Sequence, residues 1–359
     1  MSAPSSTRNE KAALLSAEGV TKSYPGGTIA LDGVDLRLSP GEIVGLIGAN
    51  GSGKTTLLKS LAGLLPPDAG RISVFGGEAG SPAARKRTGY VAQEQALDPE
   101  MTGRETAAFF ASLNGLGAAE AREAIPRLLR VFDLSDKADI AVAAYSGGMR
   151  QRLHILLEFL RRPEVVLLDE PTAGLDPAGR DAFWEYLRSH AEGGGAALLS
   201  LHELPDAAEH CSRVVLMSRG KIRAQGTPAE LVAAEGAWLW KAQFSGPPRD
   251  GKALRESLSA LPAMRAVDLG PAGVSLWSGT EPSGEKEILP LLKAAGVEVE
   301  GHSQRRPDLA SAYRLLTGQD MQAEVDKRLG KGGGGGGKGG GGGGGGRGGG
   351  NRRGGPNAH

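Results

Sequence analysis

One stretch of the chain has residue types and spacing suited to holding phosphate groups. Residues 48–55 read Gly-Ala-Asn-Gly-Ser-Gly-Lys-Thr and lie between an apolar run, Glu42–Ile47, and a helical pattern, Lys54–Leu64. Glycines let successive backbone N–H groups turn inward around a phosphate, and the helix N-terminus adds partial positive charge. Lysine reaches the outer phosphates, and the hydroxyl after it can ligate Mg²⁺. We therefore expect a nucleotide site at Gly48, Asn50, Gly51, Ser52, Gly53, Lys54, Thr55 and Thr56.

A second apolar run ends abruptly in two carboxylates. Val165–Leu168 is apolar throughout, and Asp169 and Glu170 follow it directly. Because adjacent side chains on a strand point to opposite sides, the two acids cannot share one role. Asp169 suits the Mg²⁺ shell, directly or through water, while Glu170 can orient and deprotonate the water that attacks a γ-phosphorus. The pair is typical of a site that hydrolyses the bound nucleotide.

A third motif is a helix N-terminus that could bind a second anion. Tyr145 is followed by Ser146, Gly147 and Gly148, and then by a helix with leucines on one face. Such a Ser-Gly-Gly turn presents a hydroxyl and backbone N–H groups at the positive end of a helix. One nucleotide does not need two such cradles within a single subunit.

These three elements together resemble the nucleotide-binding subunits of ATP-binding cassette (ABC) transporters, over residues 14–235. The resemblance implies a catalytic role for Glu170, for His202 as switch histidine and for Gln93, which also joins Thr55 and Asp169 at Mg²⁺. It further implies that Tyr24 stacks on adenine, that Asp176 lies in the D-loop, and that Ser146 and Gly148 close on ATP held by a partner protomer. Tyr145 and Met149 stand where Leu and Gln are usual, but Ser146 and Gly148 are retained.

The resemblance implies an ATPase that works as a homodimer or pseudo-symmetric heterodimer bound to separate membrane permease subunits. Its cofactors would be ATP and Mg²⁺. The chain length and the small C-terminal unit resemble export ATPases for drugs and polysaccharides. Two alternatives remain open: the ATPase of the system that matures the copper sites of nitrous oxide reductase, and a soluble ABC ATPase that acts on ribosomes or DNA. The residues do not name the transported substrate.

The elements that must position these residues form an α/β core. Apolar runs alternate with helical patterns such as Pro177–Glu192, which predicts a largely parallel sheet. Between Thr102 and Ile140 only helical patterns occur, and Phe109, Phe110 and Leu113 share one stripe. We therefore expect an ABC-type P-loop NTPase domain over residues 13–235, preceded by a flexible N-terminus, 1–12, and containing a helical subdomain at about 94–162.

A smaller unit is expected over residues 236–320. Its pattern reads as a strand at Trp238–Phe244, a helix, two short strands, a helix and a strand at Val297–Glu300. The order βαββαβ indicates a ferredoxin-like α+β domain, with a last helix, Pro307–Leu316, packed on it. Residues 321–359 then form a linker and a disordered, glycine-rich basic tail.

Composition narrows the function further. The glycine-rich tail itself, residues 330–359, carries five positive charges and no acid, so residues 1–329 have a net charge of −4 although the whole chain has +1. A basic nucleic-acid-binding body is therefore disfavoured, and the tail lacks the aromatic residues that usually accompany RNA-binding Arg-Gly-Gly segments. No run approaches the roughly 20 apolar residues of a membrane span. We expect a cytoplasmic protein on the cytoplasmic face of the membrane, with no specific nucleic acid as partner.

Three residues outside these motifs are interpreted as structural. The single cysteine, Cys211, lies beside His210, but no second Cys or His stands at ligand spacing, so a packed thiol is expected rather than half of a metal site. Trp238 and Trp240 share one face of a strand. We expect them in a core or an interface rather than in a base-stacking platform.

Overall fold

The computed structural model describes residues 13–94, 96–236 and 238–318. The expected N-terminal segment 1–12 and the glycine-rich tail 321–359 lie outside the described residues. In the part that is described, no helix combines the length and the apolar character needed to cross a membrane.

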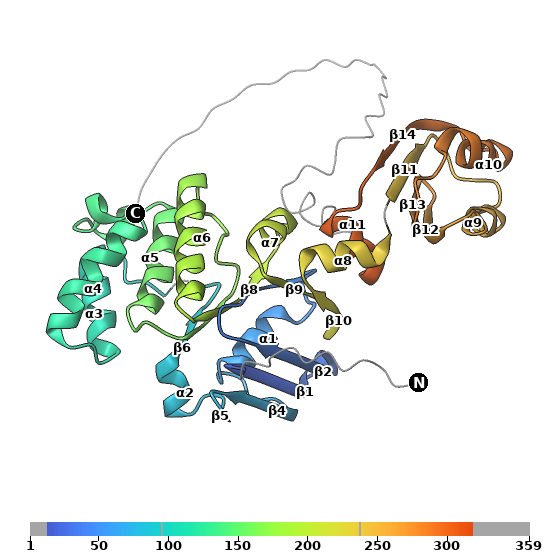
Figure 1. Ribbon diagram of the computed structural model, residues 1–359. Coiled ribbons are helices and arrows are strands. Elements are labelled where there is room, and N and C mark those ends of the chain that lie inside the picture. Colours follow the sequence, from blue (N-terminus) through green and yellow to red (C-terminus); the bar gives the residue numbers. More distant parts are fainter. Residues whose placement is uncertain (1–12, 95, 237, 319–359) are drawn as a thin grey trace, which may run out of the picture.

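A six-stranded sheet forms the centre of the larger part of the chain (Figure 1). Its order is β10-β9-β3-β8-β7-β6, and every neighbouring pair is parallel except β10 with β9 at one edge. The predicted parallel sheet is thus observed. The strands are β3 (Ile43–Gly48), β6 (Thr88–Val91), β7 (Val165–Leu168), β8 (Ala196–Leu201), β9 (Arg213–Ser218) and β10 (Lys221–Gly226).

Both faces of this sheet are buried, which explains why its central strands are apolar without alternation. Along β3, Ile43 and Ile47 belong to one hydrophobic cluster, whereas Val44 and Leu46 belong to a second cluster on the opposite face. The second cluster is shared with helix α1 and with a four-stranded antiparallel sheet of order β2-β1-β4-β5. These elements are β1 (Leu15–Tyr24), β2 (Thr28–Leu38), α1 (Lys54–Leu61), β4 (Ala69–Val74) and β5 (Gly77–Glu78).

Helices cover the other face and extend into a helical subdomain. Tyr186 of α6 packs its ring against Phe159, 4.8 Å between centroids, and Phe132, 5.4 Å, and so joins the sheet-covering helix to that subdomain. The helices are α2 (Pro82–Arg87), α3 (Gly103–Leu113), α4 (Ala118–Val131), η1 (Ser135–Lys137), η2 (Val142–Ala144), α5 (Gly147–Phe159), α6 (Pro177–Glu192), α7 (Leu204–His210) and α8 (Pro228–Glu235).

The apolar stripe on α3 is largely exposed rather than packed on the core. Phe109 is 54% exposed and Leu113 is 69% exposed, and only Phe110 packs against the core. The helix instead buries its small residues Ala107 and Ala111. Small side chains bring α3 close to its neighbours, so burial here follows packing distance rather than side-chain size.

The C-terminal unit has a four-stranded antiparallel sheet of order β12-β13-β11-β14. Trp240 lies in its own hydrophobic core, as predicted for a structural tryptophan, and stacks on His302 with centroids 5.6 Å apart. The elements are β11 (Trp238–Phe244), α9 (Gly251–Ser259), β12 (Met264–Gly270), β13 (Gly273–Ser278), η3 (Gly284–Ile288), α10 (Leu289–Ala294), β14 (Val299–Arg305) and α11 (Leu309–Thr317).

The last helix departs from its predicted position. We expected it to pack on the small unit, but Leu309 and Tyr313 are buried in the hydrophobic cluster of the larger part. In Figure 1, α11 accordingly lies beside α8, which belongs to that larger part. Arg314 of the same helix pairs with Asp268 of β12 at 2.8 Å. Helix α11 therefore joins the two parts.

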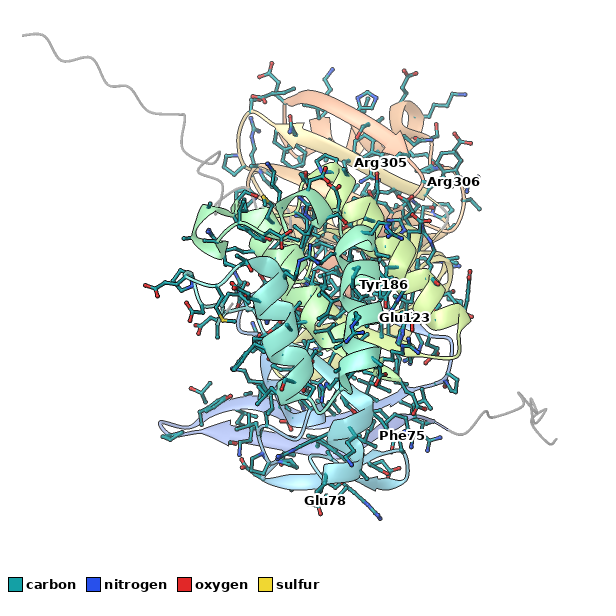
Figure 2. The ribbon with its side chains drawn as sticks, turned by 90° about the vertical axis from the view of Figure 1, so that its left-hand side faces the viewer. Phe75, Glu78, Glu123, Tyr186, Arg305 and Arg306 are labelled. Carbon is teal, nitrogen blue, oxygen red and sulfur yellow. The ribbon has the colours of Figure 1, made fainter. Side chains whose placement is uncertain are left out.

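A perpendicular view separates the antiparallel sheet from the C-terminal unit. Figure 2 places Phe75 and Glu78 at the end formed by the antiparallel sheet, and Tyr186 and Glu123 within the helices. Arg305 and Arg306, at the end of β14, lie toward the opposite end. The phosphate-loop elements β3 and α1 belong to the larger part, onto which α11 packs.

Candidate active site

The glycine-rich loop joins β3 to α1, as predicted. A side chain at Gly48 would place its Cβ 2.4 Å from Ser52 Oγ, and one at Gly53 would lie 2.3 Å from the carbonyl oxygen of Ala30. Gly53 also has φ +106°, in the left-handed region that glycine tolerates best. Only glycine fits at these two positions, which keeps the loop tightly wound at the start of the helix.

Lys54 is held inside this loop. Its Nζ donates hydrogen bonds to the carbonyl oxygens of Gly48, at 2.6 Å, and Ala49, at 3.2 Å, and the residue is only 6% exposed. The loop thus closes around its own lysine by means of carbonyl groups. An anion entering the loop would meet this cation together with the N-terminus of α1.

The two carboxylates after β7 have different environments, as their alternation predicts. Asp169 is 1% exposed, and its Oδ1 accepts a hydrogen bond from Ser200 Oγ at 2.7 Å. Its Oδ2 has no hydrogen-bond partner among the described residues. A buried carboxylate oxygen left in this state is costly, and a divalent cation or its water would satisfy it.

Glu170 faces the other way and meets two further predicted site residues. Its Oε1 lies 2.5 Å from His202 Nε2, and its Oε2 accepts a hydrogen bond from Gln93 Nε2 at 3.2 Å. Glu170 has φ +51°, a left-handed conformation that costs a non-glycine residue about 1 kcal/mol or more. Its backbone N–H donates to Ser200 Oγ at 2.8 Å and helps to hold this conformation.

The segment after His202 is fixed from the neighbouring helix. Arg180 of α6 donates two hydrogen bonds to the carboxylate of Glu203, at 2.6 and 2.8 Å. These bonds keep the pKa of the Glu203 carboxyl below its ordinary value and that of Arg180 above it. A two-point contact of this kind restricts rotation, so it orients the backbone that carries His202.

Tyr24 lies at the far side of the loop. Its hydroxyl is 3.3 Å from Thr56 Oγ1, in the first turn of α1 next to Thr55. The tyrosine is 41% exposed. An exposed ring anchored at its hydroxyl leaves a flat surface on which a base can stack.

The remaining predicted residues form a second, separate group. Ser146 caps α5, with its Oγ accepting from the backbone N–H of Met149 at 3.1 Å, and Asp176 caps α6 in the same way at Gly179, also at 3.1 Å. A Cβ at Gly148 would lie 2.8 Å from the carbonyl oxygen of Gly174, so the Ser-Gly-Gly turn contacts the loop before α6. Ser146 and Gly148 thus stand at the start of α5, whereas residues 48–55 connect β3 to α1.

Comparisons with known proteins agree with this geometry. Residues 31–173 match the family described as ABC transporter. The chain is 37% identical over 313 residues to the daunorubicin resistance ATP-binding protein DrrA3 of Streptomyces coeruleorubidus, and the match covers 86% of this chain and 98% of that protein. It is 38% identical over 297 residues to the Nod factor export ATP-binding protein I of Burkholderia thailandensis, over 82% of this chain and 94% of that one.

The chain belongs to the ATP-binding subunits of ABC transporters.

Solved structures support the same assignment. The structure of an ATP-binding subunit of an ABC transporter matches with 33% identity and a TM-score of 0.58, over 62% of this chain and 92% of that one. The structure of cbiO1 from Clostridium perfringens, part of the ABC transporter complex cbiONQ, matches with 26% identity and a TM-score of 0.56, over 70% of this chain and 96% of that one. As an ABC-type subunit the chain is an ATP hydrolase.

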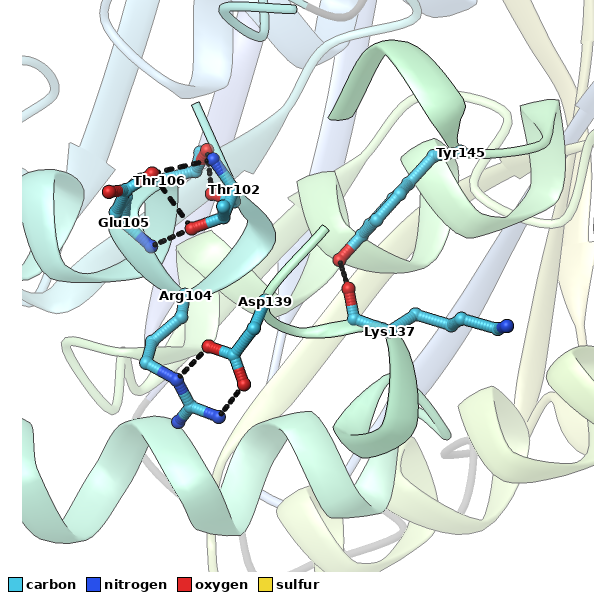
Figure 3. Close-up of polar contacts among 7 residues, drawn as sticks. All are labelled: Thr102, Arg104, Glu105, Thr106, Lys137, Asp139 and Tyr145. Atoms are coloured by element: carbon cyan, nitrogen blue, oxygen red, sulfur yellow. Dashed lines mark hydrogen bonds and ion pairs between the residues drawn. The ribbon is translucent and has the colours of Figure 1, made fainter. Parts of the chain in front are cut away.

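Tyr145 stands where Leu is usual, directly before the Ser-Gly-Gly turn that we call the signature turn of this ABC subunit, and the structure gives a reason for it. Tyr145 is buried, and its hydroxyl donates to the carbonyl oxygen of Lys137 at 2.8 Å (Figure 3). A Cβ on Gly103 would come within 2.1 Å of that hydroxyl oxygen, so the glycine makes room for the phenol. Burial raises the pKa of Tyr145, which keeps it protonated as a donor.

The N-terminus of α3 lies at this contact between Gly103 and Tyr145, because Gly103 is the first residue of the helix. Thr102 and Glu105 form a reciprocal capping box, and Arg104 donates two hydrogen bonds to Asp139, at 2.6 and 3.0 Å (Figure 3). The Arg104 contact keeps the pKa of the Asp139 carboxyl below its ordinary value. These exposed contacts, together with Tyr145, connect the signature turn of the ABC subunit to its helical subdomain.

The structure shows the surroundings of Cys211, the single cysteine of the chain. Cys211 is a free, buried thiol packed against Gly45, and burial raises its pKa to about 12. Among the described residues no group of three or more His, Cys, Asp or Glu side chains could hold a metal ion. The burial of Cys211 confirms the predicted packed thiol.

Trp238 is partly buried, and the Arg306 guanidinium lies 4.2 Å from its ring centroid.

Sequence reasoning missed two residues of this ABC site. Ser200 bridges Asp169 and the backbone of Glu170, and a polar residue inside an otherwise apolar strand two places before His202 was the available signal. Tyr313 accepts a hydrogen bond from the loop residue Ala49 at 2.9 Å across 264 positions of sequence, and nothing in its local pattern indicates this.

Proposed function

We propose that this subunit powers export: two copies, or one copy and a similar partner, hold ATP between them and drive a substrate through separate membrane permease subunits. The names of the relatives, a drug resistance protein and a Nod factor export protein, support export and disfavour the ribosome- or DNA-directed alternative. The observation that supports the shared site is that Ser146 and Gly148 stand at the start of α5, against Gly174 before α6, rather than on the β3–α1 loop that holds Lys54.

In this proposal the loop holds the phosphates, with Lys54 as its fixed cation. The loop contributors are Gly48, Asn50, Gly51, Ser52, Gly53, Thr55 and Thr56, and Tyr24 offers a surface for adenine. Ser146, Gly148 and Asp176 belong to the partner's side of each pocket. The position of this loop at the N-terminus of α1, with Lys54 buried inside it, supports the assignment.

The residues fit a magnesium ion that accompanies ATP. Thr55, Gln93 and Asp169 would hold it, and the unpartnered Oδ2 of Asp169 is the feature that supports this. Mg²⁺ sites of this kind commonly contain one or two carboxylates, together with phosphate oxygens and water, and the ion would neutralise charge that develops on the phosphates. Glu170 then accepts the proton of the attacking water, and His202, within hydrogen-bond distance of Glu170, steadies it.

The domain boundaries form part of the proposal. We infer an ATPase domain over residues 13–235, with a helical subdomain at about 94–162, and a ferredoxin-like accessory domain over 236–320. The strand order β12-β13-β11-β14, with β11 and β13 as its inner strands, supports the ferredoxin-like assignment. The subunit would lie on the cytoplasmic face of the membrane through its permease.

Co-purification tests the export proposal. The chain, expressed with its native membrane proteins, should be recovered from detergent extracts with an integral membrane partner, and ATPase activity should rise when that partner is restored in lipid vesicles. The Lys54→Ala variant should still recover the partner but hydrolyse no ATP. Recovery with ribosomes in a nuclease-sensitive complex, without a membrane partner, would contradict the proposal.

A further inference from the structure

Helix α11 closes the chain back onto the ATPase core. Asp308 caps its start by accepting hydrogen bonds from the backbone N–H of Ser311 at 2.8 Å and from Ser311 Oγ at 2.6 Å. Leu309 and Tyr313, four residues apart, lie on one face, and both enter the hydrophobic cluster that also contains Ile47 of β3 and Leu168 of β7. The helix that follows the small unit is thus anchored beside the strands that carry the site.

Tyr313 reaches the phosphate loop itself. Its hydroxyl oxygen accepts a hydrogen bond from the backbone N–H of Ala49 at 2.9 Å, and Tyr313 and Ala49 are 0% and 4% exposed. A buried N–H group requires a partner, and this one finds it outside the loop. The carbonyl oxygens of Gly48 and Ala49 accept from Lys54. The Gly48 carbonyl and the Ala49 N–H belong to the same peptide group, so Lys54 and Tyr313 bind that group from its two sides.

We propose that Tyr313 is a positioning residue for ATP binding: its hydroxyl fixes the backbone at Ala49 and thereby the entry of the phosphate loop and the resting place of Lys54. This inference rests on the proposed role of residues 48–55. It also gives the C-terminal unit a physical link to the site, because Arg314, next to Tyr313, is paired with Asp268 of β12 at 2.8 Å. A strain on the small unit would reach the loop through one helix.

The Tyr313→Phe variant isolates the hydroxyl, because it keeps the ring that fills the core. Loss of one hydrogen bond to a buried N–H should weaken ATP affinity about five- to tenfold. Affinity is measured by calorimetry with ATP and Mg²⁺ in the full chain, with Glu170→Gln present in both the reference and the variant to prevent hydrolysis. In chains that keep Glu170, KM for ATP should rise by a similar factor while kcat changes less than about twofold.

A matched control separates positioning from general stability. Tyr186→Phe removes a phenol hydroxyl from a ring that packs on the same core, and it should leave ATP affinity unchanged. Amide hydrogen exchange gives a second readout: in Tyr313→Phe the peptide that contains Ala49 should exchange at least about tenfold faster, while peptides of α3 keep their parental rates.

Three outcomes would decide the matter. Weaker ATP binding and faster exchange at Ala49 in Tyr313→Phe alone support the inference. Parental ATP affinity in Tyr313→Phe, even with a lower melting temperature, would overturn it and leave only a packing role for the helix. Absence of ATP binding in the parent chain would instead overturn the proposed role of residues 48–55, so the two failures are distinguishable.

Discussion

Ser200 Oγ donates a hydrogen bond to Asp169 Oδ1 at 2.7 Å and accepts one from the backbone N–H of Glu170 at 2.8 Å. One hydroxyl on β8 therefore holds the Asp169 carboxylate and the Glu170 backbone, directly after β7. Asp169 Oδ2 has no hydrogen-bond partner among the described residues, and Glu170 keeps a left-handed conformation with its carboxylate at His202. The two acids lie in different environments because a third residue, from the adjacent strand, fixes the turn between them.

The first prediction concerns this hydroxyl. Ser200→Ala should lower ATP turnover about five- to thirtyfold and raise the Mg²⁺ concentration needed for half-maximal rate, because one or two kcal/mol of support for the acids is lost. Steady-state ATPase assays over a Mg²⁺ titration measure both effects. Ser275→Ala, at a buried serine of β13, is the control and should change neither. An unaltered Mg²⁺ titration in Ser200→Ala would show that Asp169 is positioned without it.

The second prediction concerns the base. Glu170→Gln should bind ATP with near-parental affinity but hydrolyse it at least about a hundredfold more slowly, because the amide cannot accept the proton of water. Glu203→Gln changes a neighbouring carboxylate that Arg180 holds, and its rate should fall far less. Single-turnover hydrolysis with radiolabelled ATP provides the comparison. Parental turnover by Glu170→Gln would assign the base to another residue.

A third prediction tests the contact below the signature turn. Tyr145→Phe should lower the free energy of unfolding by about 1 kcal/mol, since the Lys137 carbonyl loses its donor. Gly103→Ala should cost more, because its Cβ would lie 2.1 Å from the tyrosine oxygen, and that cost should shrink in the double variant Gly103→Ala with Tyr145→Phe. Urea unfolding of the four proteins closes the cycle. Strictly additive losses would show that the two residues do not interact.

The fourth prediction is a pH dependence. Burial lowers the pKa of His154 and of His190 below the ordinary value of 6.5. Below pH 6.5 the unfolded chain therefore binds more protons at these histidines than the folded chain does, which favours unfolding. The contribution of the neutral, buried histidines to the free energy of unfolding is complete above pH 6.5 and is lost as the pH falls towards their lowered folded pKa. The melting temperature should fall between about pH 7.5 and about pH 5.5, and His154→Gln should show a smaller fall. Identical falls in the two proteins would rule out His154 as a contributor.

Contiguous motifs could be predicted because their chemistry depends on neighbours in sequence. The loop around Lys54, the acid pair after β7 and the cap at Ser146 all lie where their spacing predicts. Long-range contacts could not be predicted in the same way. In the sequence, Tyr313 looks like an ordinary residue on the apolar face of a helix. Its hydrogen-bond partner, the backbone N–H of Ala49, is 264 positions away, and only the packing of α11 on the larger part brings the two together.

The errors have a common physical origin. Helix α3 buries Ala107 and Ala111 rather than the larger Phe109 and Leu113, because close approach of helices favours small residues at the contact. The place of helix α11 in the sequence predicts packing on the small unit, whereas Leu309 and Tyr313 are buried in the hydrophobic cluster of the larger part. In both cases tertiary packing decided between faces that the local pattern left equivalent.

The central claim, that each ATP is held between two chains, predicts a contrast between two covalently linked dimers. In the first dimer, one half carries Lys54→Ala and the other half carries Ser146→Arg, so both lesions fall in one shared pocket and the second pocket is intact. In the second dimer, one half carries both changes, so each shared pocket has one lesion. A dimer with Lys54→Ala in one half alone shows whether a single intact pocket turns over.

The ATPase rate of these linked dimers is the direct measurement. The shared-pocket arrangement predicts that the first dimer retains the rate of the Lys54→Ala control, while the second dimer has almost none. Self-contained pockets would give the reverse, with an active second dimer and an inactive first one. An inactive first dimer beside an active second dimer would contradict the account.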